Sequence, residues 1–243
     1  MSTFVLVHGA WHGAWCWYHV IPRLQQAGHR VVAPDLASLG RDKTPVAEIT
    51  LERWTRDMCA ILDAAPEPVI LVGHSRGGIV ISSVAEQRPE RIRTLVYVAA
   101  MLAPNGKTLF DMRAQVDNPF MDANVVVSED ESTTSIHPQA IQQIFYGECS
   151  EEDVTLAQLL LLPEPVRPNA TPLRLTDGSY GRVPRVYIEC RRDRAILPAL
   201  QRKMHADLPC RKVFSIDTDH SPFFSRPQEL TELLLTVDAE TTQ

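Results

Sequence analysis

The pentapeptide Gly73-His74-Ser75-Arg76-Gly77 constrains the fold of this chain more than any other stretch. An apolar run at residues 68–72 precedes it, and a segment compatible with a helix, residues 76–87, follows it. A serine on a sharp turn between a strand and a helix holds its hydroxyl clear of both elements, and flanking glycines let neighbouring backbone approach closely. Gly-x-Ser-x-Gly alone occurs often by chance. Its place between a predicted strand and a predicted helix favours a nucleophilic serine at position 75.

Strand-like and helix-like segments alternate along the rest of the chain, which predicts an α/β fold. Most of the predicted strands are continuous apolar runs, as is typical of a parallel sheet covered by helices on both faces. We expect a mostly parallel sheet of about six strands. The expected strands are residues 4–7, 30–34, 68–72, 94–99, 185–189 and 212–216, and the expected helices are residues 17–27, 51–64, 76–87, 198–206 and 227–237.

A serine hydroxyl needs a base to take its proton and a carboxylate to orient that base. On a strand-turn-helix scaffold of this kind the expected chain order is serine, acid, histidine. His220 lies in a loop near the C-terminus, after the predicted strand 212–216, and is the expected base. Asp193, in the loop after the predicted strand 185–189, is the favoured acid. Asp219 stays a minor rival, because it adjoins the base and would reach the imidazole only with awkward geometry.

Acyl transfer also needs hydrogen-bond donors for the oxyanion of the tetrahedral intermediate, each worth about 3 to 4 kcal/mol. The backbone N–H of Arg76, directly after the serine, is one expected donor. The loop at residues 8–13 follows the predicted strand 4–7 and is expected to supply the second. Gly9 permits a tight turn there that points the Ala10 N–H into the site.

Four segments of the chain resemble the α/β-hydrolase superfamily and, within it, the methylesterase and hydroxynitrile lyase group. The resemblance implies the α/β-hydrolase fold, with Ser75 as nucleophile, His220 as base and Asp193 as acid. It also implies that Ala10 and Arg76 donate the two oxyanion-hole N–H groups. The segments that carry the resemblance, in the expected order along nearly the whole chain, are residues 4–15, 69–78, 193–198 and 219–222.

Two departures from the group bear on the chemistry. Hydroxynitrile lyases of this type carry a threonine after the oxyanion-loop histidine and a lysine after the catalytic histidine, where the lysine stabilises the leaving cyanide. Gly9 and Ser221 stand at those positions here, so hydrolysis is favoured over lyase chemistry. Arg76 replaces the aliphatic residue that follows the nucleophile in plant relatives. Its side chain could alter the local field or pair with a carboxylate.

We therefore expect a cofactor-free serine hydrolase that cleaves a small to medium apolar carboxylic ester through an acyl-enzyme intermediate. A small-molecule ester is the expected partner, because the motif loops hold no cluster of basic residues for a strongly anionic substrate. Three alternatives stay open: a hydrolase of a carbamate or amide-like bond, a hydroxynitrile lyase, and a ligand receptor that keeps the fold without catalysis.

Residues 103–181 break the alternation and are longer than a connection between two strands needs. We expect them to form a helical cap over the site, inserted between core segments 1–102 and 182–243. Amphipathic pieces at residues 139–146 and 154–162 would then supply apolar pocket walls. The candidate pocket residues are Phe145, Leu159 and Leu161 from the cap, and Trp11, Trp15 and Phe223 from the loops of the core.

Charge and cysteine content argue against several classes of protein. A net charge of −6 and a pI near 5.7 argue against a nucleic-acid surface. No stretch approaches the ~18 apolar residues of a membrane span, and the start lacks the features of a signal peptide, so we expect a cytoplasmic protein. The five cysteines lack paired spacing and fit reduced thiols. No metal site is expected, and the oligomeric state stays open.

Overall fold

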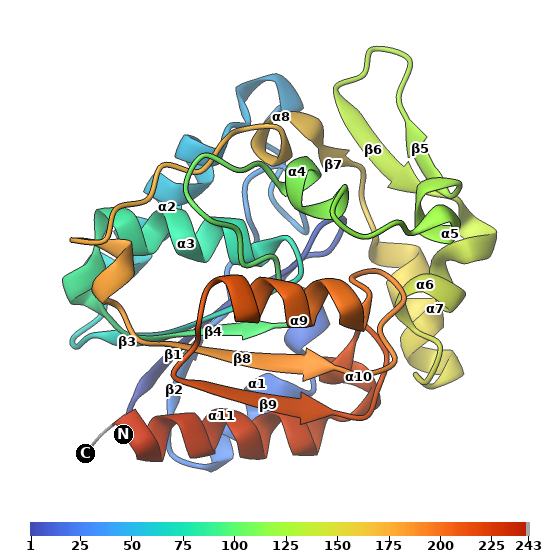
Figure 1. Cartoon of the computed structure of the whole chain (residues 1–243). Coiled ribbons are helices and arrows are strands. Elements are labelled where there is room, and N and C mark those ends of the chain that lie inside the picture. Colours follow the sequence, from blue (N-terminus) through green and yellow to red (C-terminus); the bar gives the residue numbers. More distant parts are fainter. Residues whose placement is uncertain (242–243) are drawn as a thin grey trace.

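A six-stranded parallel sheet forms the centre of the molecule (Figure 1). The computed structural model describes residues 1–241, and its strands lie in the order β2-β1-β3-β4-β8-β9. Every expected strand is present, with ends that differ from the prediction by no more than two residues. The strands are β1 (Thr3–Val7), β2 (Arg30–Val32), β3 (Val69–His74), β4 (Ile92–Val98), β8 (Arg185–Cys190) and β9 (Lys212–Ile216).

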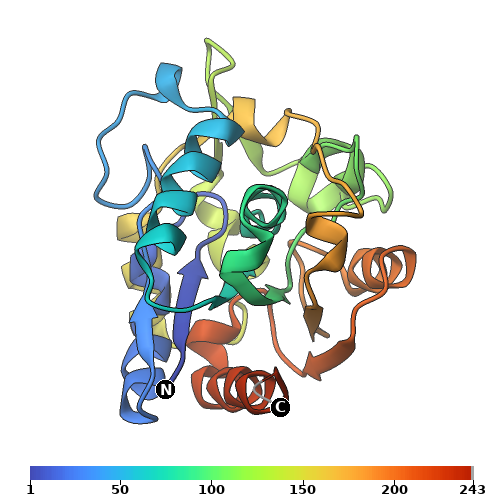
Figure 2. The ribbon, with the colours of Figure 1, turned by 90° about the vertical axis from the view of Figure 1, so that its left-hand side faces the viewer.

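Helices cover both faces of this sheet, as the continuous apolar runs predicted. One face packs against α2 (Leu51–Ala64), α3 (Gly77–Gln87) and α9 (Pro198–Asp207), and the other against α1 (Val20–Gln26) and α11 (Pro227–Thr241). Figure 2 shows the same layers from the side, with α3 and α11 on opposite sides of the sheet. The α/β fold expected from the sequence is therefore confirmed.

Local sequence explains where helix α2 begins. The Thr50 side chain accepts a hydrogen bond from the Arg53 N–H at 3.0 Å, which caps the first turn of α2.

Short elements complete the core. They are α10 (Pro222–Ser225) and the 3-10 helices η1 (Ala14–Trp17), η2 (Val46–Glu48), η3 (Pro89–Arg91) and η5 (Tyr180–Arg182).

Residues 103–181 lie between β4 and β8 in the sequence and extend over the carboxyl ends of the strands (Figure 1). The expected helical pieces are present, but the segment also contains a three-stranded antiparallel sheet in the order β5-β6-β7. Its strands are only two to four residues long, β5 and β6 are partly exposed and β7 is buried but polar in part, so they leave no strand-length apolar run in the sequence. The elements are α4 (Leu109–Arg113), α5 (Pro119–Asp122), β5 (Val125–Val127), β6 (Thr133–Ile136), η4 (Pro138–Ala140), α6 (Ile141–Phe145), α7 (Glu151–Leu160), β7 (Glu164–Pro165) and α8 (Val166–Asn169).

The turn between β3 and α3 is tight because its glycines have no side chains. A Cβ atom on Gly73 would lie 2.9 Å from the Gly77 carbonyl oxygen. A Cβ atom on Gly78 would overlap the backbone of Met101, in the loop after β4. The first turn of α3 therefore rests directly on neighbouring backbone, which holds the turn at the carboxyl edge of the sheet.

Replacing Gly78 by alanine tests this packing. We expect Gly78→Ala to lower the free energy of unfolding by about 1 to 3 kcal/mol, because the Met101 backbone must move, although alanine is the better helix former. Gly147→Ala is the matched control, since a Cβ atom there meets nothing within 4 Å. Urea denaturation of both variants measures the difference. Equal stability of the two variants would contradict the close approach.

Candidate active site

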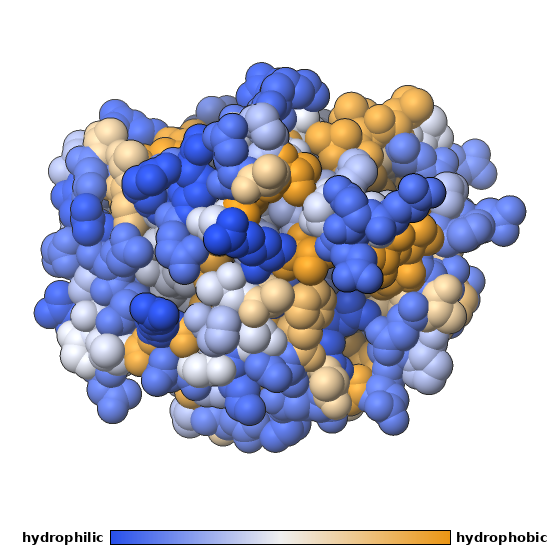
Figure 3. Space-filling view, turned by 90° about the horizontal axis from the view of Figure 1, so that it is seen from above, coloured by the Kyte–Doolittle hydropathy of each residue, from blue (hydrophilic) through white to orange (hydrophobic). Residues whose placement is uncertain are grey.

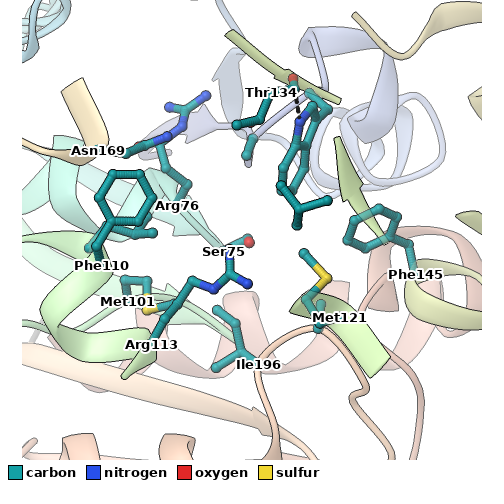
Figure 4. Close-up of a pocket in the computed structure, with 15 residues that line it drawn as sticks. Ser75, Arg76, Met101, Phe110, Arg113, Met121, Thr134, Phe145, Asn169 and Ile196 are labelled. Carbon is teal, nitrogen blue, oxygen red and sulfur yellow. Dashed lines mark hydrogen bonds between the residues drawn. The ribbon is translucent and has the colours of Figure 1, made fainter. Parts of the chain in front are cut away.

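Ser75 occupies the turn between β3 and α3 in a left-handed backbone conformation, with φ of 52°. Such a conformation costs free energy for a residue with a side chain and persists only where the surroundings enforce it. Here the Ser75 carbonyl accepts hydrogen bonds from the N–H groups of Gly78 at 3.1 Å and Met101 at 2.9 Å. The turn projects the Ser75 hydroxyl into a pocket, at the centre of Figure 4.

His220 and Asp193 form a buried pair at the ends of two neighbouring loops. The His220 Nδ1 and Asp193 Oδ2 atoms are 2.7 Å apart. The other Asp193 oxygen accepts hydrogen bonds from the N–H groups of Ala195 at 2.7 Å and Ile196 at 2.9 Å. Since an ionised carboxylate only accepts hydrogen bonds, the imidazole proton belongs on Nδ1, which leaves Nε2 as the basic nitrogen.

Gln201, on α9, is a partner of this pair that the sequence reasoning missed. Its side-chain N–H donates to Asp193 Oδ2 at 3.1 Å and to the Ile196 carbonyl at 2.7 Å, while its oxygen accepts from the Cys190 N–H at 3.0 Å. Gln201 is fully buried beside Leu200. A polar residue at a buried position of an amphipathic helix is the signal that could have revealed it.

Asp219, the rival acid, has other partners. One of its oxygens accepts from the Glu148 N–H at 2.8 Å, and the other accepts from the Ser221 N–H at 3.1 Å and the Ser225 hydroxyl at 3.0 Å. The structure therefore places Asp193, and not Asp219, against the His220 imidazole. Asp219 instead ties the loop after β9 to the residues that follow α6.

His74 links the turn of Ser75 to the loop of His220. Its Nε2 atom lies 2.8 Å from the His220 carbonyl oxygen and donates to it, and the two rings are 4.5 Å apart between centroids. Burial lowers the pKa of His74 well below its usual value, so the ring is neutral. Among residues 1–241 no direct hydrogen bond joins the Ser75 hydroxyl to the His220 ring. In the free form of a site such contacts are commonly long.

The loop after β1 brings Ala10 to the same pocket as Ser75 and Arg76. Its shape is held by His12, whose Nδ1 atom donates to the Ala10 carbonyl at 2.6 Å and whose Nε2 atom accepts from the Tyr146 hydroxyl at 2.6 Å. Burial lowers the pKa of His12 to about 3, so the ring stays neutral. Tyr146, from the inserted segment, was not foreseen because its partner is far away in the sequence.

The Arg76 side chain pairs with a carboxylate, which was one of the two possibilities that the sequence left open. Its Nε atom lies 2.8 Å from Glu164 Oε1, and both side chains are buried. Glu164 was missed because it is a single acidic residue in β7, with no local pattern around it.

The pocket above Ser75 encloses about 550 Å³, part of it open to solvent, and its walls are mainly apolar. Figure 4 shows Met121 and Phe145 on one side of Ser75 and Met101 and Phe110 on the other. An outer groove of about 790 Å³ adjoins it, with Arg113 common to both linings. Figure 3, seen from above, shows hydrophobic patches among hydrophilic residues on this face.

Two of the six pocket candidates named from the sequence, Trp11 and Phe145, line this pocket. Trp15 lines a separate surface depression instead, and Leu161 packs into the apolar cluster beneath. Phe223 lies under the turn, with its ring 4.9 Å from that of His74.

Leu159 requires a correction. Its side chain is 77% exposed, although the sequence placed it at the pocket wall. Helix α7 turns its buried face, with Val154 and Ala157, toward the core, so Leu159 points to solvent. Four successive leucines hid which residue of the helix faces inward.

Residues 1–241 contain no group of three or more histidine, cysteine or acidic side chains arranged to hold a metal ion. In the same range, no helix combines the length and the apolar character needed to cross a membrane.

Comparison with known proteins gives the family. Residues 4–233 match the model of the alpha/beta hydrolase family. The chain belongs to this family. Esterase PIR7B of Oryza sativa subsp. japonica is 33% identical, over 96% of this chain and 94% of its own length. An Arabidopsis thaliana protein of the methylesterase series (number 11, chloroplastic) is 36% identical over 97% of this chain, which spans only 64% of that protein.

Solved structures agree with this assignment. A pyrethroid hydrolase from Sphingobium faniae JZ-2 has a TM-score of 0.88 at 27% identity, over 97% of this chain and 96% of its own. This alpha/beta hydrolase is therefore of the esterase type, as its sequence predicted.

Because buried histidines stay neutral in the folded protein, we expect the free energy of unfolding to fall in mild acid. The pKa of His12 is about 3 in the folded protein, whereas the ordinary pKa of a histidine is 6.5. Between these values the unfolded chain binds the extra proton, so the contribution is full above pH 6.5 and is lost as the pH falls toward 3. We expect His12→Gln to reduce the slope of unfolding free energy against pH by about 1 kcal/mol per unit between pH 6 and 5.

Urea denaturation at several pH values measures this slope. His137→Gln is the control, because His137 is exposed and its replacement leaves the slope unchanged. An identical slope in parent and His12→Gln would contradict a neutral, buried His12.

Proposed function

We propose that this hydrolase cleaves a small to medium apolar carboxylic ester through an acyl-enzyme intermediate on Ser75. One observation carries the proposal. The Ser75 hydroxyl projects from a strained turn into an apolar pocket, and the same turn contacts, through His74, the loop of a buried histidine–carboxylate pair. Nucleophile, base and orienting acid are the three parts that acyl transfer from a serine requires.

In the first half of the reaction, His220 Nε2 takes the proton of the Ser75 hydroxyl as the oxygen attacks the ester carbonyl carbon. Asp193 holds the ring through Nδ1 and stabilises the imidazolium that forms. The carbonyl oxygen becomes an oxyanion between the N–H groups of Ala10 and Arg76, which belong to two loops that line the same pocket.

The imidazolium then gives its proton to the alcohol oxygen as the bond between that oxygen and the carbonyl carbon breaks, so the alcohol leaves and the acyl group stays on Ser75. In the second half, a water molecule gives a proton to His220 and attacks the acyl carbon. The bond from this carbon to the Ser75 oxygen then breaks, the imidazolium returns its proton to that oxygen, and the carboxylic acid is released. Every proton in this cycle passes through His220, so no cofactor is required.

The pocket suggests the substrate class. Its walls offer apolar contacts from both the core and the inserted segment, which suits an apolar small molecule. Both arginines in its lining are already paired, Arg76 with Glu164 and Arg113 with Asp122. Relatives named for methyl esters and for pyrethroids support an ester whose alcohol can vary in size.

The proposal includes a cap formed by residues 103–181 over a core of residues 1–102 and 182–243. Phe110, Met121 and Phe145 of the inserted segment line the pocket, so the cap would exclude water from the acyl-enzyme. The cytoplasmic location expected from the sequence stays a prediction.

Ser75→Ala tests the nucleophile. We expect turnover of p-nitrophenyl acetate to fall at least about 1000-fold, with an unchanged circular dichroism spectrum, because only the attacking oxygen is lost. A fluorophosphonate probe should label the parent at Ser75 and leave the variant unlabelled. Parent-like hydrolysis by Ser75→Ala would refute the proposal, and absent labelling of a parent that binds ligands tightly would indicate a receptor.

A pair of aspartate variants tests the orienting acid. We expect Asp193→Asn to lower kcat about 10⁴-fold, because an amide N–H facing Nδ1 would favour the wrong imidazole tautomer. Asp219→Asn is the matched control, and it should keep kcat within a few-fold while lowering stability, since Asp219 accepts hydrogen bonds from backbone N–H groups, the Ser225 hydroxyl and the Cys149 thiol. Steady-state kinetics of both variants on the same ester measures the two values of kcat. A large loss in Asp219→Asn and a small one in Asp193→Asn would assign the orienting role to Asp219.

A further inference from the structure

Arg76 and Glu164 form an ion pair that is almost completely excluded from water. Both side chains are no more than 1% exposed, with Arg76 Nε 2.8 Å from Glu164 Oε1. Glu164 also accepts from the Asn169 side chain at 3.3 Å, and the guanidinium lies 4.3 Å above the ring of Trp54. Burying two charges costs several kcal/mol per ion unless further hydrogen bonds offset it. Two further hydrogen bonds join this ion pair to the loop that carries Ala10.

The first of them fixes the peptide that carries the Ala10 N–H. Arg76 Nη2 donates to the Gly9 carbonyl oxygen at 3.0 Å. In a trans peptide the C=O and N–H groups point in opposite directions. Because the Gly9 oxygen and the Ala10 N–H belong to one peptide unit, drawing the oxygen toward Arg76 turns the N–H away from it. Ala10 lines the pocket with Ser75.

His8 supports the same peptide from its other side. The Leu36 N–H donates to His8 Nε2 at 3.0 Å, so the proton of this ring is on Nδ1, which donates to the Gly9 oxygen at 2.9 Å. Burial lowers the pKa of His8 to about 3, so the ring is neutral and this tautomer is fixed. Arg76 is therefore the charged donor of the two.

The second hydrogen bond between the ion pair and this loop holds the next peptide along the chain, between Ala10 and Trp11. Glu164 Oε2 accepts from the Trp11 N–H at 3.1 Å. Trp11 has φ of 63°, a left-handed conformation that is rare for a bulky residue and must be enforced by its neighbours. The Leu162 N–H donates to the Trp11 carbonyl at 2.9 Å, and the Trp11 ring N–H donates to the Thr134 carbonyl at 3.0 Å. All three contacts come from the inserted segment.

We propose that the buried Arg76–Glu164 pair is a positioning device for the oxyanion hole, through which the inserted segment completes the catalytic centre. The inference rests on the proposed function, since it concerns the geometry of the same site. One residue joins both donors: the Arg76 backbone supplies one N–H, and its side chain orients the peptide that supplies the other. The positive charge of the Arg76 guanidinium, next to the Gly9 oxygen, also polarises that peptide and strengthens the Ala10 N–H as a donor.

The pair acts on the transition state and not on substrate binding, because the oxyanion exists only after the attack. Its removal should therefore lower kcat and leave KM nearly unchanged. If the pair had a purely structural role, its removal would change the stability of the protein without this selective fall in kcat. The two possibilities are separable because a buried ion pair can often be replaced by apolar side chains with little loss of stability.

The double variant Arg76→Met/Glu164→Leu is the test. On p-nitrophenyl butyrate, after Ser75-dependent turnover of the parent has been established, we expect kcat to fall about 100-fold, the loss typical of one displaced oxyanion donor. Heptyl trifluoromethyl ketone, which forms a tetrahedral adduct with an activated serine, should bind more weakly by a similar factor. Methyl heptyl ketone, with the same chain but no stable adduct, should bind as it does to the parent.

The matched control is Arg202→Met/Glu189→Leu. This pair also joins an arginine to a buried glutamate, at 3.0 Å, but it contacts neither the loop of Ala10 nor the turn of Ser75. We expect kcat and both ketone affinities to stay within a few-fold of the parent. A loss equal to that of the test variant would show that removing any such pair impairs the enzyme, which would overturn the positioning role.

Arg76→Lys gives a second measurement should the double variant fail to fold. Lysine keeps the charge beside Glu164, but a single ammonium lacks the planar fork that reaches both Glu164 and the Gly9 oxygen. We expect a loss of kcat of about 10-fold or more, with the pH profile unchanged because His220 is untouched. Parent-like kcat in Arg76→Lys, or in a folded double variant, overturns the positioning role alone, whereas a parent that hydrolyses no ester overturns the proposed function and the inference with it.

Discussion

Backbone packs directly against backbone where β3 turns into α3, and the arrangement of the site depends on this contact. A Cβ atom on Gly77 would lie 2.9 Å from the Val7 carbonyl oxygen, and one on Gly78 would overlap the backbone of Met101. The absence of these side chains lets the ends of β1, β3 and β4 converge on one point. Ser75 and the loop of Ala10 meet there, and the strain at Ser75 is held by hydrogen bonds from the same neighbours.

Two chains of hydrogen bonds reach this point from opposite sides. One runs from Asp193 through His220 to His74 and lies within the core. The other runs from Glu164 through Arg76 to the Gly9 carbonyl and begins in the inserted segment. Both are buried, so the loss of any one of these hydrogen bonds would be costly. In the proposed mechanism, the core thus orients the groups that would move protons, while the insertion orients the peptide N–H that would face the oxyanion.

Local patterns made much of this architecture predictable. All six strands of the main sheet were predicted, most of them from continuous apolar runs, because burial on both faces leaves a direct trace in the sequence. Helix α2 was predicted with its observed bounds. The antiparallel sheet of the insertion left no comparable trace, since its strands are only two to four residues long and two of them are partly exposed. Leu159 was placed at the pocket wall because a run of leucines does not reveal which one faces inward. Gln201 and Tyr146 were missed because their partners lie on other elements.

The sequence by itself determined the α/β class, the turn at Ser75 and the order of serine, aspartate and histidine along the chain, because each depends on spacing within one element or on the succession of elements. Only the tertiary structure decided that Asp193 rather than Asp219 faces the imidazole, and that Arg76 meets Glu164. The latter two residues are 88 positions apart, and a contact of that range leaves no periodicity to read. It arises only when the insertion packs against the core and water is excluded between them.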